Sequence, residues 1–158
     1  MRSHTFRVFS AALLAAAFGL LQAQAKPNFS GTWKLNVSKS DFGAMPAPDT
    51  RTDKITHDDP SLTDSFTQNG QMGEVTTEIK YSTDGKETTN HVRGNEVKST
   101  AKWEGDELTI ASKAQFNGAE VTFSDRWSLS ADGKTLTILR HAVSPMGETD
   151  QKIVLEKQ

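Results

Sequence analysis

The sequence predicts an all-β protein: an antiparallel up-and-down meander barrel of about ten strands, preceded by a cleaved signal peptide. Apolar and polar residues alternate along most of the chain, which is the period of a half-buried strand. Turn pairs such as Asn-Gly and Asp-Gly recur at short intervals, and they favour two-residue hairpin loops because both central residues take a positive φ. The faces that these loops would bring together are mutually consistent from residue 62 to the C-terminus.

The first 25 residues have the three parts of a secretory signal peptide. "MRSHTFR" is basic, "VFSAALLAAAFGLL" is apolar, and "AQA" at 23–25 is a small-residue cleavage site. The apolar run is shorter than the roughly 20 residues that a membrane-spanning helix needs. We therefore expect a signal peptide over 1–25 and one secreted or periplasmic domain over 26–158, with no stable membrane insertion after cleavage.

Composition narrows the function classes. The chain carries 18 basic and 20 acidic side chains with no basic cluster, so we expect no nucleic-acid partner. It has no cysteine, so the core and hydrogen bonds must supply its stability. The four histidines show no metal-ligand spacing, and no nucleophile or phosphate-binding motif occurs. We expect no catalytic residue, no metal and no cofactor, and the oligomeric state is left open.

The alternation and the turn signals together delimit ten strands. In the first of them Phe29, Trp33 and Leu35 share one side. The two after it are the most polar, and Pro60 suits the turn between them. The expected ranges are 29–37, 51–57, 62–68, 74–83, 86–93, 96–104, 107–116, 119–130, 135–143 and 148–156.

Turn positions also predict which residues oppose each other. A two-residue loop at Asp132-Gly133 places Leu129 opposite Leu136 and Asp125 opposite Arg140. The same reasoning at the other two-residue loops predicts further opposed pairs: Trp127 and Ile138, Phe123 and Ala142, Phe116 and Ala119, Ala114 and Val121, Leu108 and Trp127, Trp103 and Leu108, Ala101 and Ile110, Val92 and Val97, Thr88 and Ala101, Tyr81 and Thr88, and Ile79 and Asn90. Across four-residue loops it predicts three more pairs: Phe66 and Val75, Ile138 and Ile153, and Leu136 and Leu155.

A sheet with one apolar face has to cover that face, and no helix is available to do so. Pairing the last strand with the first covers it and removes both sheet edges. A two-sheet sandwich is the alternative, but the uniform hairpin connections favour a barrel.

The segment 38–50 is the one long irregular stretch. Pro46 and Pro48 exclude a long helix, while a single helical turn fits near 40–43. Phe42 and Met45 have two interpretations: they plug one end of the barrel, or they are tucked under a surface loop.

The expected inner face carries an opposed acid and base, Asp125 and Arg140, with Gln151 opposite Arg140 on the next strand. Directly opposed side chains have Cβ atoms about 4.5–5.5 Å apart, within reach of a salt bridge. One interpretation is structural, since a buried pair roughly offsets its own desolvation. The other is that Arg140 faces a cavity and helps to hold a ligand.

Small side chains cluster on three neighbouring strands of the same face, which indicates a cavity in a barrel of this width. Alternatively, Phe42 or Trp33 fills that space. By the same register His57, Asp53 and Asp64 face inward. The candidate ligand-binding residues are Trp33, Asn90, Ser99, Trp103, Ser112, Phe123, Asp125, Trp127, Arg140 and Gln151.

The stretch "NFSGTWKLN" at 28–36, with Gly31-Thr32-Trp33, resembles the opening of the calycin superfamily, the lipocalins and fatty-acid-binding proteins. The later run "KWEGDELTI…ADGKTLTI" is similar to hairpins of the fatty-acid-binding branch. The resemblance implies a barrel that binds a small apolar ligand, with Arg140 packed on Trp33. Two features depart from that branch: 38–50 has no room for a helix-turn-helix lid, and an Arg-x-Tyr near the C-terminus is absent.

The sequence thus predicts an exported, lipocalin-like protein that binds a small hydrophobic or amphipathic ligand without catalysis. Two other functions stay open. One is a barrel enzyme that acts on a small polar substrate through Asp125 and Arg140. The other is a structural or interaction protein whose barrel is filled.

Overall fold

The computed structural model describes residues 25–71 and 73–158, and these form one ten-stranded antiparallel sheet. The predicted signal peptide lies almost wholly outside the described residues. The predicted fold class is confirmed, and the predicted strands agree with the observed ones closely. The elements are β1 (Gly31–Leu35), the 3-10 helix η1 (Val37–Lys39), β2 (Thr50–Asp58), β3 (Ser61–Gly70), β4 (Gly73–Ser82), β5 (Asp84–Val92), β6 (Asn95–Glu104), β7 (Glu107–Phe116), β8 (Ala119–Leu129), β9 (Thr135–Ser144) and β10 (Gly147–Lys157).

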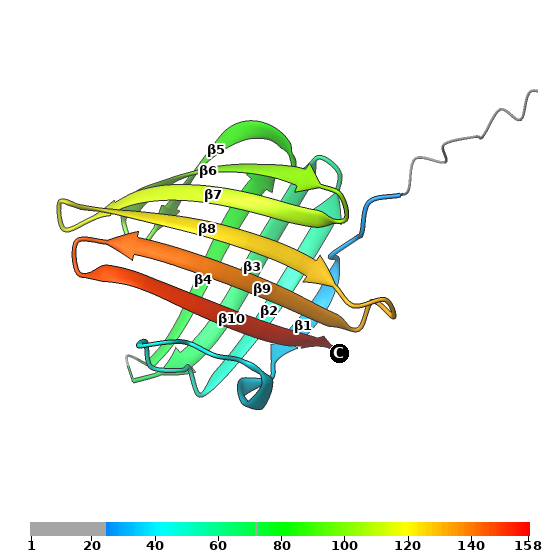
Figure 1. Ribbon diagram of the computed structural model, residues 1–158, viewed down its shortest axis with the longest axis horizontal. Helices are drawn as coiled ribbons and strands as arrows, with labels where there is room; N and C mark the ends of the chain where they lie inside the picture. Colours follow the sequence, from blue (N-terminus) through cyan, green and yellow to red (C-terminus); the bar gives the residue numbers. More distant parts are fainter. Residues whose placement is uncertain (1–24, 72) are drawn as a thin grey trace, which may run out of the picture.

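The sheet closes through its first and last strands. Its order is β4-β3-β2-β1-β10-β9-β8-β7-β6-β5, so β1 pairs with β10 as expected. Trp33 lies opposite Lys157, and Leu35 lies opposite Leu155. In Figure 1, β1 to β4 pass behind β6 to β10 at a steep angle, and the core lies between these two layers. Among the described residues, no helix combines the length and the apolar character that crossing a membrane would require.

The barrel is nearly rather than fully closed, because β4 and β5 are the two edges of the sheet. The expected pairs of Tyr81 with Thr88 and of Ile79 with Asn90 are therefore wrong. β5 pairs with β6 alone, and its register is irregular between Asp84 and Glu87, where the turn was expected to hold it against β4. The Asn90 side chain bridges the gap instead: its Oδ1 accepts from Lys80 N at 2.8 Å and its Nδ2 donates to Lys80 O at 2.9 Å.

Two further turns differ from the prediction. Val92 lies opposite Asn95, because Arg93 and Gly94 form the loop with φ values of 50° and 78°. This corrects the expected pairs of Val92 with Val97 and of Thr88 with Ala101.

The loop between β3 and β4 is also shorter than expected. Gly70 pairs with Gly73, so Phe66 lies opposite Thr77 and not Val75. Each of these shifts is two residues, which leaves the same side chains on the inner face. The remaining predicted pairs are confirmed.

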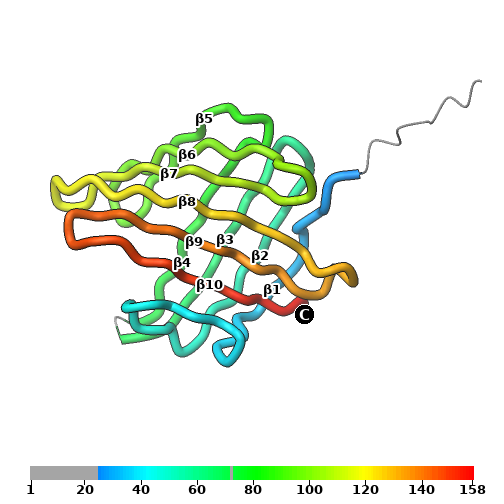
Figure 2. Tube along the Cα trace, viewed as in Figure 1, coloured from blue at the N-terminus to red at the C-terminus, as the bar shows by residue number. Residues whose placement is uncertain are grey.

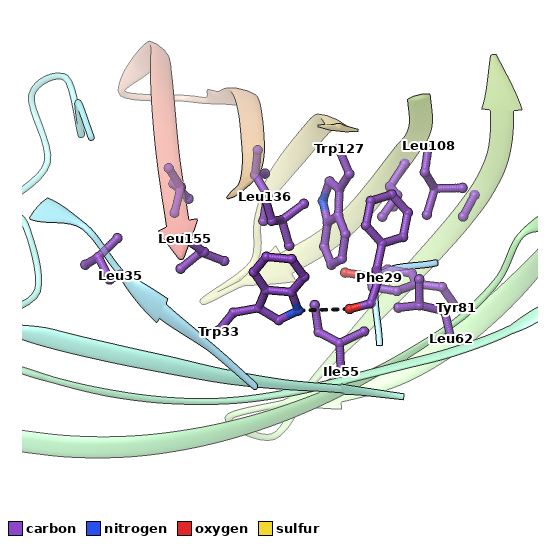
Figure 3. Packing of buried hydrophobic residues seen from close by; sticks show 14 residues of the cluster. Phe29, Trp33, Leu35, Ile55, Leu62, Tyr81, Leu108, Trp127, Leu136 and Leu155 are labelled. Atoms are coloured by element: carbon purple, nitrogen blue, oxygen red, sulfur yellow. Dashed lines mark hydrogen bonds between the residues drawn. The ribbon is translucent and has the colours of Figure 1, made fainter. Parts of the chain in front are cut away.

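Aromatic rings fill one end of the barrel. Phe29, Trp33 and Trp127 are buried, and the indole Nε1 of Trp33 donates to Phe29 O at 2.9 Å (Figure 3). The ring of Phe29 stacks on Trp103 at a centroid distance of 5.7 Å and on His57 at 5.6 Å. Leucine and isoleucine side chains from β2, β3, β7, β9 and β10 complete this packed end.

A polar network seals the packed end. His57 faces inward as expected; its Nδ1 accepts from Phe29 N, so its Nε2 donates to Asp59 at 2.9 Å. Thr83 and Trp103 donate to the same carboxylate. Burial alone would raise the pKa of Asp59, but the hydrogen bonds from Thr83, His57 and Trp103 lower it.

The segment between β1 and β2 lies against β10. Its helical turn is η1, just before the expected 40–43, and the Asn36 side chain caps it by accepting from Lys39 N. Phe42 packs against the core, but Met45 is 56% exposed, so a plug that includes Met45 is wrong. Gly43 has a φ of +58° and lies close to β10. A Cβ at this position would be only 2.7 Å from Asp150 O, so the close approach requires a glycine.

The Asn90 bridge makes a testable prediction. Asn90→Ala removes both hydrogen bonds to Lys80, and we expect it to lower the free energy of unfolding by about 1–3 kcal/mol. Urea unfolding measures this loss, and hydrogen exchange at the Lys80 amide should accelerate. The control is Asn69→Ala, since Asn69 is exposed on β3. Equal losses in the two variants would contradict a bridging role.

Candidate ligand-binding site

The interior of the barrel changes character along its axis. Inward-facing side chains at the end sealed by Phe29 are almost all buried. At the opposite end Val97 and Ala114 are buried, but several other inward-facing residues remain half-buried, so water reaches part of the interior there. These residues are Val75, Val92, Phe116, Val121, Phe123, Ala142 and Thr149. Figure 2 shows the β7/β8 and β9/β10 turns at this accessible end, on the side away from the C-terminus.

Between the two ends lies a layer of charged side chains. Its first pair is the expected one: Asp125 opposes Arg140, and the guanidinium donates from Nε at 2.8 Å and from Nη2 at 2.7 Å. Gln151 also opposes Arg140 as expected, but its amide donates to Phe42 O at 3.4 Å. Gln151 therefore connects the segment before β2 to the barrel wall.

The second pair was not foreseen. Arg51 and Asp53 are two residues apart on β2, and the guanidinium donates to the carboxylate at 2.8 and 2.6 Å. The alternation of β2 was the available signal, because residues two apart on a strand share a face. The prediction placed Asp53 inward but did not consider Arg51.

Each arginine covers a phenylalanine ring. The Arg51 guanidinium lies 4.3 Å from the ring centre of Phe66, and that of Arg140 lies 5.3 Å from Phe123. Such contacts are favourable because the face of the ring is electron-rich. The inner face of the barrel is therefore amphipathic here, with a guanidinium beside an aromatic ring on both sides of the barrel.

The expected packing of Arg140 on Trp33 is wrong. The cation over Trp33 is Lys157, whose Nζ lies 5.3 Å from the ring centre. The register explains the difference, since Lys157 is directly opposite Trp33 across the closing ladder. Arg140 pairs with Gln151 nearer the accessible end, one strand further from β1.

Asp64 is the charged residue of this layer without a cationic partner of its own. It is 3% exposed on β3, and its Oδ1 is buried with no hydrogen-bond partner among the described residues. Burial and the nearby Asp53 carboxylate outweigh the attraction of Arg51 and Arg140, and they raise the pKa of Asp64 to about 7. Its inward orientation was predicted, but its isolation was not.

The other candidate residues divide between the two parts of the interior. The hydroxyls of Ser99 and Ser112 share a hydrogen bond of 2.8 Å on the inner face of the barrel. Trp33, Trp103 and Trp127 belong to the packed end, where Trp127 Nε1 is buried without a partner in the described chain. The structure thus gathers the candidates on one inner face, and their contact with a ligand stays a prediction.

Two hollows lie on the outer surface. One has a volume of about 290 Å³ over β6 to β8, and the other has about 460 Å³ over β8 to β10. Their linings come mainly from the outward-facing residues of these strands, such as Lys102, Arg126 and Lys152. His141 lies in the second hollow and contacts Asp150 at 2.7 Å.

The nearly closed meander, with Gly31-Thr32 and the buried Trp33 in its first strand, has the fold of a calycin barrel. No protein-family model matches the sequence, and no curated protein does.

Solved structures share the fold. One is zebrafish ileal bile acid-binding protein complexed with cholic acid, at 18% identity and a TM-score of 0.54, over 82% of this chain and 98% of that one. Another is a secretory abundant heat soluble protein from Ramazzottius varieornatus, at 13% identity and a TM-score of 0.59, over 85% of this chain and 97% of that one. At these identities the likeness shows the fold alone.

The ion pairs predict a graded response to the removal of arginine. Arg51→Ala leaves Asp53 buried and unpaired, so we expect a loss of about 3–5 kcal/mol in the free energy of unfolding. Arg140 is 28% exposed, against 8% for Arg51, so water compensates Asp125 in part and we expect about 2–3 kcal/mol. Arg126→Ala, at an outward position, should cost less than about 1 kcal/mol. Denaturant unfolding measures all three, and a reversed order would contradict the assigned burial.

Asp64 predicts a pH dependence of stability. The pKa of Asp64 in the folded chain, about 7, lies above its ordinary value of 3.8, so the folded state binds the proton more tightly. The contribution is fully present below about pH 4 and is lost as pH rises through 7, with a total of up to about 4 kcal/mol. Asp64→Asn removes this dependence.

Urea midpoints of wild type and Asp64→Asn between pH 4 and pH 8 test this expectation. Relative to the variant, the wild type should lose stability steadily across that range. The control is Asp106→Asn in an exposed turn, which should follow the wild type. A constant difference between wild type and Asp64→Asn would show that Asp64 is not buried as an isolated acid.

Proposed function

We propose that this chain is an exported, lipocalin-like binding protein that takes a small hydrophobic or amphipathic ligand into its barrel from the accessible end. One observation carries the proposal: the interior is packed at one end, while several inward-facing apolar side chains at the other end stay half-buried. A folded domain normally buries such side chains, so a surface of this kind inside a barrel favours a ligand site.

The composition of the wall supports an amphipathic ligand. Phe66 and Phe123 offer apolar contact, and the hydroxyls of Ser99 and Ser112 offer hydrogen bonds. The zebrafish protein of the same fold is complexed with cholic acid. Export is supported by the signal-peptide pattern of residues 1–25.

The arrangement gives less support to the enzyme alternative. A general base has to be accessible to its substrate, whereas Asp125 is 6% exposed and both of its carboxylate oxygens accept hydrogen bonds from Arg140. The filled-barrel alternative predicts no saturable ligand binding, whereas the proposal predicts that a ligand binds. One binding measurement therefore distinguishes the two.

The binding test uses a neutral apolar dye, N-phenyl-1-naphthylamine, titrated into the purified mature chain. We expect saturable binding with one site per chain. Ser112→Trp places a large ring in the barrel interior and should weaken binding at least tenfold. Ala111→Trp, the adjacent residue on the outer face, should bind as the wild type does. Circular dichroism checks that both variants fold.

Each outcome of this test has one meaning. Absence of saturable binding to the wild type would indicate a filled barrel and would contradict the proposal. Loss of binding in Ala111→Trp alone would place the ligand in the outer hollow and would also contradict it.

A further inference from the structure

The charged layer inside the barrel holds more acidic than basic side chains. It contains two arginines and three aspartates, and each arginine is engaged by one carboxylate: Arg51 by Asp53 and Arg140 by Asp125. With Asp64 ionised, the layer carries one negative charge in excess. A buried charge without a partner is costly, so the excess is a site where a compensating ligand charge gains most.

Asp64 faces groups from three other strands. Asp53 and Arg51 lie on the neighbouring β2, Tyr81 on the neighbouring β4, and Arg140 on β9 across the barrel. The two arginines are committed to other carboxylates, and Tyr81 is neutral because burial and the carboxylates of Asp125 and Asp64 raise its pKa. None of these groups neutralises Asp64, whose Oδ1 is buried without a hydrogen-bond partner in the described chain.

This arrangement discriminates between ligand head groups. A carboxylate would add a second negative charge beside Asp64, while each guanidinium already gives two of its five N–H donors, and its charge, to another aspartate. An alcohol would donate one hydrogen bond without changing the charge. A primary ammonium group donates up to three hydrogen bonds and neutralises the layer.

We propose that the barrel selects amphipathic amines, with the ammonium group held by the Asp64 carboxylate and the apolar body lying toward the accessible end. The inference rests on the proposed function, because it names the ligand class of the same barrel interior. It assigns to Asp64 a binding role, and it gives Arg51 and Arg140 the role of keeping the other two carboxylates occupied.

The test compares three ligands of equal chain length: dodecylamine, dodecan-1-ol and dodecanoate. Each displaces N-phenyl-1-naphthylamine from the wild type at pH 8, below the concentration at which it aggregates. We expect dodecylamine to bind at least tenfold more tightly than dodecanoate, with dodecan-1-ol between them. Tightest binding by dodecanoate or dodecan-1-ol would overturn the proposal.

Two further readouts identify Asp64 as the group responsible. Dodecylamine stays protonated from pH 5 to pH 8, as lysine does, so its affinity should rise about tenfold over this range as Asp64 loses its proton. Asp64→Asn should lower dodecylamine affinity at least tenfold and abolish this rise, while dodecan-1-ol changes less than threefold. Asp106→Asn should match the wild type. Unchanged dodecylamine binding in Asp64→Asn would overturn the proposal.

Failure of this inference is distinguishable from failure of the proposed function. If the neutral dye binds and Ser112→Trp blocks it, but dodecylamine shows no preference, then the barrel binds ligands and the amine selectivity is wrong. If the dye does not bind the wild type at all, the proposed function itself is wrong.

Discussion

The buried core and the charged layer of this molecule both depend on the ladder that pairs β1 with β10. It places Trp33 opposite Lys157 and buries the indole completely, with its Nε1 bonded to Phe29 O. Gly31 shows how close this approach is: its φ is +143°, and a Cβ there would lie 2.8 Å from Lys157 Cε. Without the ladder, the apolar face of ten strands would meet water and the charged layer would have no interior to occupy.

Inside the barrel, the packed end and the charged layer make different contributions to stability. The packed end excludes water with aromatic rings, so it contributes mainly to stability. The charged layer contributes little net stability, because the desolvation of each pair opposes its attraction. Buried ion pairs that add little stability have two possible roles: they specify one arrangement of the strands, or they contact a ligand. Asp64 favours the second role, since a purely structural layer gains nothing from an acid without a partner.

The gap between β4 and β5 is the second departure from a regular barrel. The Asn90 side chain accepts one hydrogen bond from Lys80 N and donates one to Lys80 O in place of a ladder there, and the same residue is buried inside the barrel. A barrel wall held by one side chain is weaker locally than one held by a continuous ladder. The accessible end and this gap are therefore the parts of the wall where the interior has the least cover.

Strand register was predictable from the sequence where a local turn sets it, and it was not predictable where the partner strand is chosen by distant parts of the chain. The register predicted from the Asp132-Gly133 turn is right, so Asp125 and Arg140 lie opposite each other as the sequence indicates, although only Gly133 of the two takes a positive φ. The predicted register is wrong by two residues at the turn between β5 and β6, because Arg93 takes a positive φ and forms the loop with Gly94. It also failed at β4 and β5, where the choice between two possible partner strands is not local.

The sequence by itself determined the strand count, the inner face and the closing of a meander, because alternation and turn residues act over a few neighbouring positions. Only the tertiary structure decided how the inner residues meet across the barrel. It put Lys157 rather than Arg140 on Trp33, added Arg51 to Asp53, and left Asp64 without a partner. These outcomes depend on distances between strands far apart in the chain, and no local rule of the backbone contains them.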